Sequence, residues 1–412
     1  MFKAKTISKR SLIALLGPAF VAAIAYVDPG NVAANLTAGA KYGYLLVWVL
    51  VISNIMAVIV QYLSAKLGIV RGQSLPEILG QKMPRRWRLA YWLQAEIIAI
   101  STDLAEIIGG AIAFKLLFNI PLFWGGVITG ILSMFILMVK ERHGQRVFEF
   151  VIVGFLFLLT VGFCAGLFLT PPDAHQVLVG LEPRFEGAET VLLAVSMLGA
   201  TVMPHAVYLH SALTRDRFPI SDGGNFERVK RLLSATRVDV VIALVVAGSV
   251  NIGMLLLAAV SLQGAVGTDT IDGAYQAIKD TLGIHIAFLF AIGLLASGLA
   301  STSVGCYAGA EVMQTLLKVR IPLLVRRLIT LIPALVLLAT GISPTLLLVI
   351  SQVILSFGIP FALIPLVMIT SDKILLGKFA NKWYLSVIAW FVASLITLLN
   401  VVLLYLVFTN QR

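Results

Sequence analysis

Apolar stretches of roughly 20 residues recur along the whole chain, and each can cross about 30 Å of hydrocarbon as an α-helix. Within a bilayer only helices and closed barrels satisfy their own backbone hydrogen bonds. The apolar runs are continuous, whereas the strands of a barrel would alternate, so the pattern predicts an all-α fold. Composition agrees, because 59% of the 412 residues are hydrophobic and 12% are charged, against about 25% charged in soluble domains. The sequence therefore predicts an integral membrane protein.

The hydropathy pattern predicts about eleven spans joined by short loops. The longest loops, near 170–186 and 262–282, are polar, and the chain is predicted to form a single transmembrane domain over residues 1–412. The predicted spans are 12–38, 44–69, 89–117, 122–139, 147–169, 187–212, 233–260, 283–316, 327–341, 345–370 and 384–408.

The formal net charge of +11 comes from basic clusters that all fall on one side of the predicted spans. By the positive-inside rule this side is cytoplasmic. The N-terminus is then cytoplasmic, and an odd number of spans leaves the C-terminus extracytoplasmic. Clusters between spans differ from the basic face of a nucleic-acid-binding domain, so no nucleic acid is expected. The clusters lie at residues 3–10, 71–88, 140–146, 215–231, 318–327 and 373–382.

Two predicted spans contain a helix-breaking sequence at mid-membrane depth: DPGN at 28–31 in the first and MPH at 203–205 in the sixth. Spans five apart have opposite orientations, as an inverted repeat of spans 1–5 and 6–10 requires. Interrupted segments at matching positions of two halves indicate a transporter binding site. We therefore predict repeats at approximately 12–169 and 187–370, followed by an additional helix at 384–408.

The prolines of these breaks leave backbone oxygens available as ligands. Proline has no N–H, so the carbonyl four residues earlier loses its helical partner. These carbonyls belong to Ala25, before Pro29, and to Ala200, before Pro204. A bare carbonyl inside a bilayer costs several kcal/mol, and a cation is its natural partner. Asp28 adds the negative charge that such a site needs.

The thioether of Met203 narrows the choice of cation. Oxygen ligands alone suit magnesium or calcium as well as other metals. A thioether is soft and has little affinity for hard cations, so its presence favours first-row transition metals. We predict a metal site formed by Asp28, Asn31, Met203 and the carbonyls of Ala25 and Ala200.

Three carboxylates, Glu96, Asp103 and Glu106, lie along one stripe of the third predicted span. Carboxylates that face lipid would be prohibitive, so they are expected to face the protein interior, where they can relay protons, pair with arginine, or do both. Arg326 and Arg327 begin the ninth span. The sequence fits these arginines equally well as partners of the carboxylates and as cytoplasmic anchors.

Other polar residues also lie inside apolar runs. His205 and His210 follow the break in the sixth span, and histidine titrates near neutral pH, which suits a proton carrier. Core packing is the alternative for both, and His205 has the better claim because it is nearer the predicted metal. Gln352, mid-way along the tenth span, either offers an oxygen or packs. Arg237 and Asp239 are predicted to form a structural pair in the seventh span.

With the DPGN and MPH sequences both in place, the chain resembles the Nramp family, specifically its bacterial proton-coupled manganese transporters. The resemblance covers the whole chain and includes TDLAE at 102–106, ST at 301–302, AG at 308–309 and SQ at 351–352. It implies a LeuT-like inverted repeat of 5+5 helices plus one, with helices 1 and 6 broken. It also implies import of Mn²⁺ or Fe²⁺ by proton symport with alternating access, across a bacterial inner or plasma membrane.

The resemblance assigns roles to residues of this sequence. It implies metal coordination by the predicted ligands, joined by Gln352 in some states. It implies proton passage near Asp28, Asp103, Glu106 and His205 towards Arg326 and Arg327. Ala206 and Ala310 depart from the family pattern, but neither removes a metal ligand. We expect no cofactor, since the metal is cargo, and the expected partners are divalent metal ions, protons and the bilayer, with no obligatory protein partner.

Two other functions would use parts of the same pattern. A sodium-coupled amino-acid carrier would share the architecture and bind a carboxylate at helix ends, but the charge of Asp28 opposes an anionic substrate. A membrane metalloenzyme would use His205, His210 and Asp28, yet the sequence has neither an HExxH pair nor a glutamate beside these histidines to activate water. We therefore expect a transporter and not an enzyme.

Overall fold

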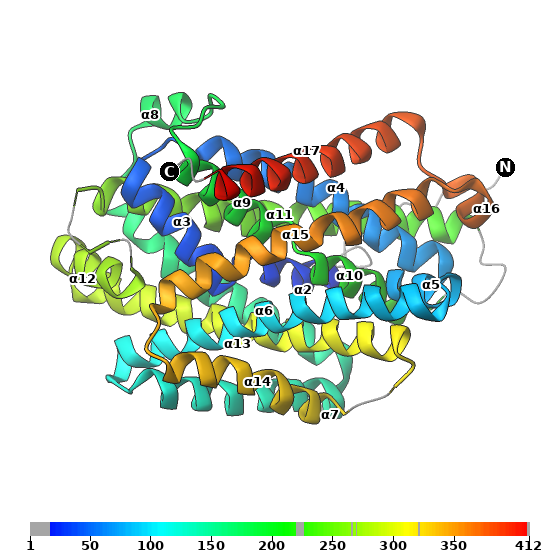
Figure 1. The fold of residues 1–412 in the computed structure, drawn as a ribbon, viewed down its shortest axis with the longest axis horizontal. Helices are drawn as coiled ribbons and strands as arrows, with labels where there is room; N and C mark the ends of the chain where they lie inside the picture. Colours follow the sequence, from blue (N-terminus) through cyan, green and yellow to red (C-terminus); the bar gives the residue numbers. More distant parts are fainter. Residues whose placement is uncertain (1–16, 220–225, 265–266, 269, 320–321, 410–412) are drawn as a thin grey trace, which may run out of the picture.

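The apolar runs form long helices that pack side by side (Figure 1). The computed structural model describes residues 17–219, 226–264, 267–268, 270–319 and 322–409. All regular structure within these ranges is helical. The predicted basic cluster at 3–10, the start of the first predicted span and Arg320 lie outside the described residues.

The helices are α2 (Pro18–Ile24), α3 (Pro29–Tyr42), α4 (Val47–Arg71), α5 (Leu75–Lys82), α6 (Arg85–Phe118), α7 (Leu122–Cys164), α8 (Ala174–Val179), α9 (Ala188–Thr201), α10 (Pro204–Arg217), α11 (Phe226–Ser261), α12 (Ile271–Leu282), α13 (Ile284–Leu316), α14 (Leu323–Ala339), α15 (Pro344–Ser371), α16 (Lys373–Leu376) and α17 (Trp383–Phe408). Short 3-10 turns, η1 (Ala25–Val27), η2 (Ala165–Phe168) and η3 (Gly377–Phe379), complete them.

Nine helical segments of the described chain are long and apolar enough to cross a membrane. Two of them share α7, which bends at Gly144, where φ is 82°. The other two predicted spans are the first, divided among α2, η1 and α3, and the ninth, which is the 17-residue α14. The prediction of an all-α, multi-pass membrane protein is thus confirmed.

The predicted loops at 170–186 and 262–282 were wrong in one respect, because they contain the short helices α8 and α12. In α12, Ile271, Ala274, Tyr275 and Ile278 are buried. This spacing places one apolar face of the helix against the protein. A hydropathy profile does not reveal α12, because the helix is short and its other residues are polar.

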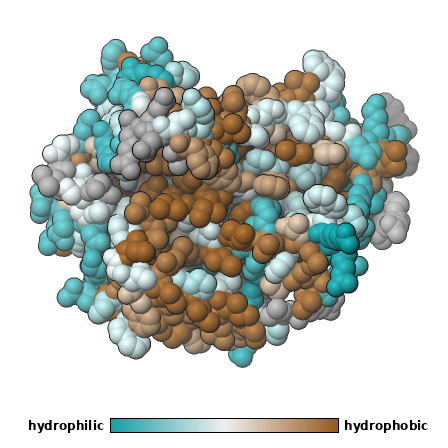
Figure 2. Space-filling view, viewed as in Figure 1, coloured by the Kyte–Doolittle hydropathy of each residue, from teal (hydrophilic) through white to brown (hydrophobic). Residues whose placement is uncertain are grey.

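The two ends of the molecule are distinct. In Figure 1, α5 and α16 lie at one end, α8 and α12 lie at the opposite end, and α17 runs between the two. Figure 2 shows a hydrophobic surface between more polar ends. Large apolar side chains such as Phe157 and Phe391 are 68% and 66% exposed, as expected for residues that contact lipid chains.

The predicted pair of Arg237 and Asp239 is wrong. Asp239 accepts hydrogen bonds from the backbone N–H groups of Gly17, at 3.2 Å, and Ala19, at 3.1 Å, and so caps the start of α2. Arg237 instead lies over the ring of Tyr62, 5.4 Å from its centre. Helix positions two residues apart do not face each other, and the free N–H groups of a helix start attract a carboxylate.

Candidate metal site

The first broken helix restarts at Asp28. This residue has an extended backbone, and its carboxylate Oδ1 accepts the N–H of Asn31 at 2.7 Å, so it is the N-cap of α3. Pro29 follows at the first helical position, where a missing N–H costs nothing. The Asp-Pro sequence is therefore a helix start in the interior of the protein, and it places the carboxylate at the break.

The second break has the same form. Helix α9 ends at Thr201, Met203 is extended at the N-cap of α10, and Pro204 occupies the first turn. Met203 is fully buried and makes no side-chain capping bond. Met203 therefore stands at a helix start where a capping residue is usual, but its side chain has no oxygen to cap it.

Two residues that the sequence reasoning missed hold the first break open. Asn251 of α11 donates its side-chain N–H to the carbonyl of Tyr26 at 2.7 Å, and Ser297 of α13 donates its hydroxyl to the carbonyl of Val27 at 2.5 Å. These bonds satisfy carbonyls that a continuous helix would have satisfied itself. In the sequence, each of these two residues is a polar residue within an apolar run, and this pattern could have identified them.

Four of the predicted metal-site residues meet between the breaks. Oδ1 of the buried Asp28 also accepts the side-chain N–H of Asn31 at 3.1 Å, and Oδ2 accepts that of Gln352 at 2.9 Å. Asn31 donates to the carbonyl of Ala200 at 2.9 Å as well. A Cβ on Gly30 would lie 1.6 Å from the Gln352 side-chain nitrogen, so glycine makes room for this amide beside Asp28. Gln352 of α15 therefore belongs to this group and is not merely a packing residue.

Two oxygens of this group have no hydrogen-bond partner among the described residues: the side-chain carbonyls of Asn31 and Gln352. Ala25 and Met203 are buried at the two breaks. A buried carboxylate beside unsatisfied carbonyl oxygens is costly unless a cation neutralises the charge. The donor set suits a partly dehydrated divalent cation.

The two histidines face different helices. Nδ1 of His205 lies 3.4 Å from the Thr102 hydroxyl of α6, and its Nε2 has no partner within the described chain. Nδ1 of His210 lies 2.8 Å from Oε1 of Gln61, and the side-chain N–H of Gln61 donates to the Tyr26 hydroxyl. The structure thus directs His205 towards the carboxylate-bearing helix and directs His210 towards α4.

The carboxylates of α6 and the arginines of α14 form a buried series. Arg326 contacts Glu96 at 3.0 Å, and Arg327 contacts Asp103 at 3.0 Å. The arginines are 1% and 0% exposed, so they are not interfacial anchors. Glu106 is fully buried, and neither of its carboxylate oxygens has a hydrogen-bond partner in the described part of the chain.

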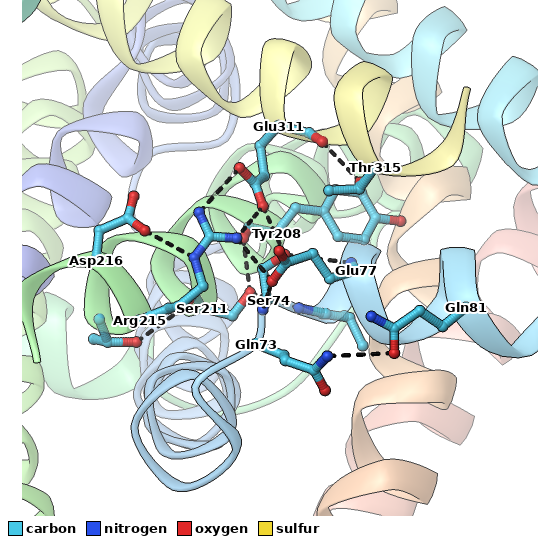
Figure 3. A network of polar contacts seen from close by, with 12 residues as sticks. Gln73, Ser74, Glu77, Gln81, Tyr208, Ser211, Arg215, Asp216, Glu311 and Thr315 are labelled. Atoms are coloured by element: carbon cyan, nitrogen blue, oxygen red, sulfur yellow. Dashed lines mark hydrogen bonds and ion pairs between the residues drawn. The ribbon is translucent and has the colours of Figure 1, made fainter. Parts of the chain in front are cut away.

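A second polar network lies where α5, α10 and α13 meet (Figure 3). The Arg215 guanidinium contacts Glu77 at 2.8 Å, Glu311 at 2.7 Å and Asp216 at 2.8 Å. The Ser74 hydroxyl also donates to Glu311 at 2.7 Å. Sequence reasoning treated Arg215 only as part of a basic cluster, because its partners are distant in the chain.

The chain is similar to known proteins over nearly its whole length. The profile described as natural resistance-associated macrophage protein-like (Nramp) matches residues 19–406. A protein of Mycobacterium tuberculosis named divalent metal cation transporter MntH is 58% identical over 396 residues, which cover 96% of this chain and 92% of that protein.

Solved structures agree with the match in sequence. The manganese transporter of Eremococcus coleocola has a TM-score of 0.87 and 31% identity, with coverage of 98% of this chain and 88% of that one. MhsT in complex with L-phenylalanine has a TM-score of 0.57 at 15% identity, covers 93% and 98% of the two chains, and shows a common fold alone.

Proposed function

The chain belongs to the Nramp family, and from this premise we propose that it is a divalent metal cation transporter that imports manganese or ferrous ions by proton symport with alternating access. The observation that carries the proposal is the fully buried carboxylate of Asp28 between two broken helices, beside the unsatisfied oxygens of Asn31 and Gln352. The proposed ligands are Asp28, Asn31, Met203, the carbonyls of Ala25 and Ala200, and Gln352.

A transporter must release the ion that it binds, and a small set of ligands with a single charge is suited to this. The Asp28 carboxylate offsets the loss of water from the ion, while the neutral oxygens and the Met203 sulfur bind it without adding charge. The side-chain N–H groups of Asn31 and Gln352 donate to this carboxylate. The oxygens of the same two amides are the atoms that would bind the ion.

We propose that protons leave Asp28 by way of His205 and the carboxylates of α6. Glu106 supports this route because it is buried without a hydrogen-bond partner in the described chain, whereas Asp103 and Glu96 are held by Arg327 and Arg326. An unpaired carboxylate inside a membrane protein can gain and lose a proton without breaking an ion pair. His210 is the further candidate, on the α4 side.

The proposed topology follows the charge pattern. The N-terminus is cytoplasmic, the C-terminus is extracytoplasmic, and the protein resides in a bacterial cell membrane. Two inverted repeats, approximately 12–169 and 187–370, contribute one broken helix each, and α17 is additional. Support comes from α5 and α16, which adjoin basic clusters and lie at the same end of the molecule (Figure 1).

Uptake by the purified protein in proteoliposomes tests the function. Mn²⁺ should enter against an excess of Ca²⁺, and Asp28→Asn should abolish uptake because shape is kept while the only formal charge among the proposed ligands is lost. Asp372→Asn, which alters a carboxylate capping α16, is the matched control and should transport normally. Parental uptake by Asp28→Asn would place the site elsewhere, and no Mn²⁺ uptake by the parent would refute the function.

A further inference from the structure

Helix α15, which carries Gln352, contains two internal prolines, Pro360 and Pro365. Each deprives the carbonyl four residues earlier of its usual N–H partner. These carbonyls belong to Ser356 and Phe361. The helix therefore has two carbonyls within two turns that its own backbone does not satisfy, and each needs a donor from elsewhere.

Both carbonyls accept hydrogen bonds from other helices. The side-chain N–H of Asn400 in α17 donates to the Ser356 carbonyl at 3.0 Å. The hydroxyl of Tyr91 in α6 donates to the Phe361 carbonyl at 2.6 Å. Each donor thus bonds to the one carbonyl that a proline has freed. Apolar helices can pack together without such hydrogen bonds.

The positions of the two donors make this more than incidental contact. Asn400 is 4% exposed and belongs to a helix without charged residues, where a buried amide is costly unless it is paired. Tyr91 gives its proton to Phe361, so Tyr208 of α10 must be the donor in the 2.8 Å contact between the two hydroxyls. The α15 backbone is thereby linked to α10, the helix whose N-cap is Met203.

The Ser356 carbonyl lies one helical turn after Gln352, where α15 also contacts α9. A Cβ on Gly199 would lie 2.1 Å from the Gln352 carbonyl and 2.9 Å from the Ser356 nitrogen. The two backbones are therefore in direct contact beside Ala200. Gln352 therefore lies against α9 and within one helical turn of the first carbonyl that a proline has freed.

We propose that Asn400 and Tyr91 are positioning residues of the metal site. By replacing the N–H groups that the prolines lack, they fix the bend of α15 and with it the reach of Gln352 to Asp28. The additional helix α17 then has a defined task, which is to supply one of these donors. The inference rests on the proposed function, since its effect is measured on metal transport.

The test is the dependence of each effect on Gln352. In proteoliposomes, Asn400→Leu should raise the KM for Mn²⁺ several-fold, and in a Gln352→Leu background it should cause no further rise. Tyr91→Phe removes only a hydroxyl and should behave in the same way even if Asn400→Leu folds poorly. An unchanged KM in Tyr91→Phe and in folded Asn400→Leu would overturn the proposal. An equal rise with and without Gln352 would do the same, and would mean that the two side chains hold α15 in the bundle without positioning Gln352.

A matched control separates positioning from general damage. Thr397→Val alters α17 one turn earlier, where the hydroxyl donates to the Ala393 carbonyl of its own helix. This variant should retain the parental KM, and a rise equal to that in Asn400→Leu would contradict the proposal. Failure of the parent to transport Mn²⁺ refutes the proposed function instead.

A second measurement tests the role of the carbonyl itself. Pro360→Ala returns a backbone N–H to Ser356. Introduced into Asn400→Leu, it should recover the melting temperature that the single substitution loses. Absence of recovery would show that the Asn400 amide serves something other than this carbonyl.

Discussion

Selectivity at the scale of single residues is expected to depend on Met203, the soft ligand of the proposed site. Met203→Ala removes the sulfur and leaves the oxygen ligands, which hard cations accept. The variant should admit Ca²⁺ or Mg²⁺ and keep part of its Mn²⁺ uptake, as measured by competition in proteoliposomes. Met197→Ala, a buried methionine within α9, is the control. Calcium exclusion equal to that of the parent would mean that the sulfur only packs.

Gly30 is a second residue whose effect can be predicted. Its missing side chain makes room for the Gln352 amide, which a Cβ would approach to 1.6 Å. Gly30→Ala should displace this amide from Asp28 and weaken Mn²⁺ binding in calorimetry, with a small effect on melting because the amide ends a flexible side chain. Gly154→Ala, where a Cβ meets nothing within 4 Å, should be neutral. Unchanged binding in Gly30→Ala would argue against a role for Gln352.

The element that separates proton coupling from metal binding is α6. Asp103→Asn with Glu106→Gln keeps side-chain volume but removes two groups that accept protons. Metal binding should largely survive, whereas Mn²⁺-driven acidification of the vesicle interior, followed with a pH-sensitive dye, should fall. Proton flux per metal equal to that of the parent would eliminate this helix as the route.

The same double variant needs a control for folding. Asp103 pairs with the buried Arg327 at 3.0 Å, and loss of one partner of a buried pair typically costs about 3–5 kcal/mol. Glu106→Gln alone leaves that pair intact. It should therefore melt close to the parent and still show reduced proton flux.

At the scale of the whole molecule, the Arg215 network joins α10 to α5 and α13, which are distant in the chain (Figure 3). A double-mutant cycle of Arg215→Gln and Glu311→Gln should give a coupling energy of about 0.5–3 kcal/mol in thermal or denaturant unfolding. The Lys41–Glu189 pair, with side chains 40% and 50% exposed, is the control and should give about 0–1 kcal/mol. Equal coupling in the two cycles would mean that the network contributes no more than a surface pair.

Several features of this protein followed from the sequence by itself. The apolar runs determined the spans, because crossing a bilayer requires a length of apolar helix that local sequence supplies. Asp28-Pro29 and Met203-Pro204 indicated both breaks, because proline lacks the N–H that a continuous helix needs and fits the first position of a new one. The charge of Asp28 and the chemistry of Met203 are likewise local properties, and they carried the functional prediction.

The tertiary structure alone decided which partners these residues meet. Asp239 caps a helix more than 200 positions away, and Asn251 and Ser297 hold a break in a helix that is equally distant. The sequence left Arg326 and Arg327 open between two roles, and only their burial beside α6 resolved this. A hydropathy profile records how apolar a segment is but not which face meets which neighbour. Pairing between helices depends on packing directions that no local pattern contains.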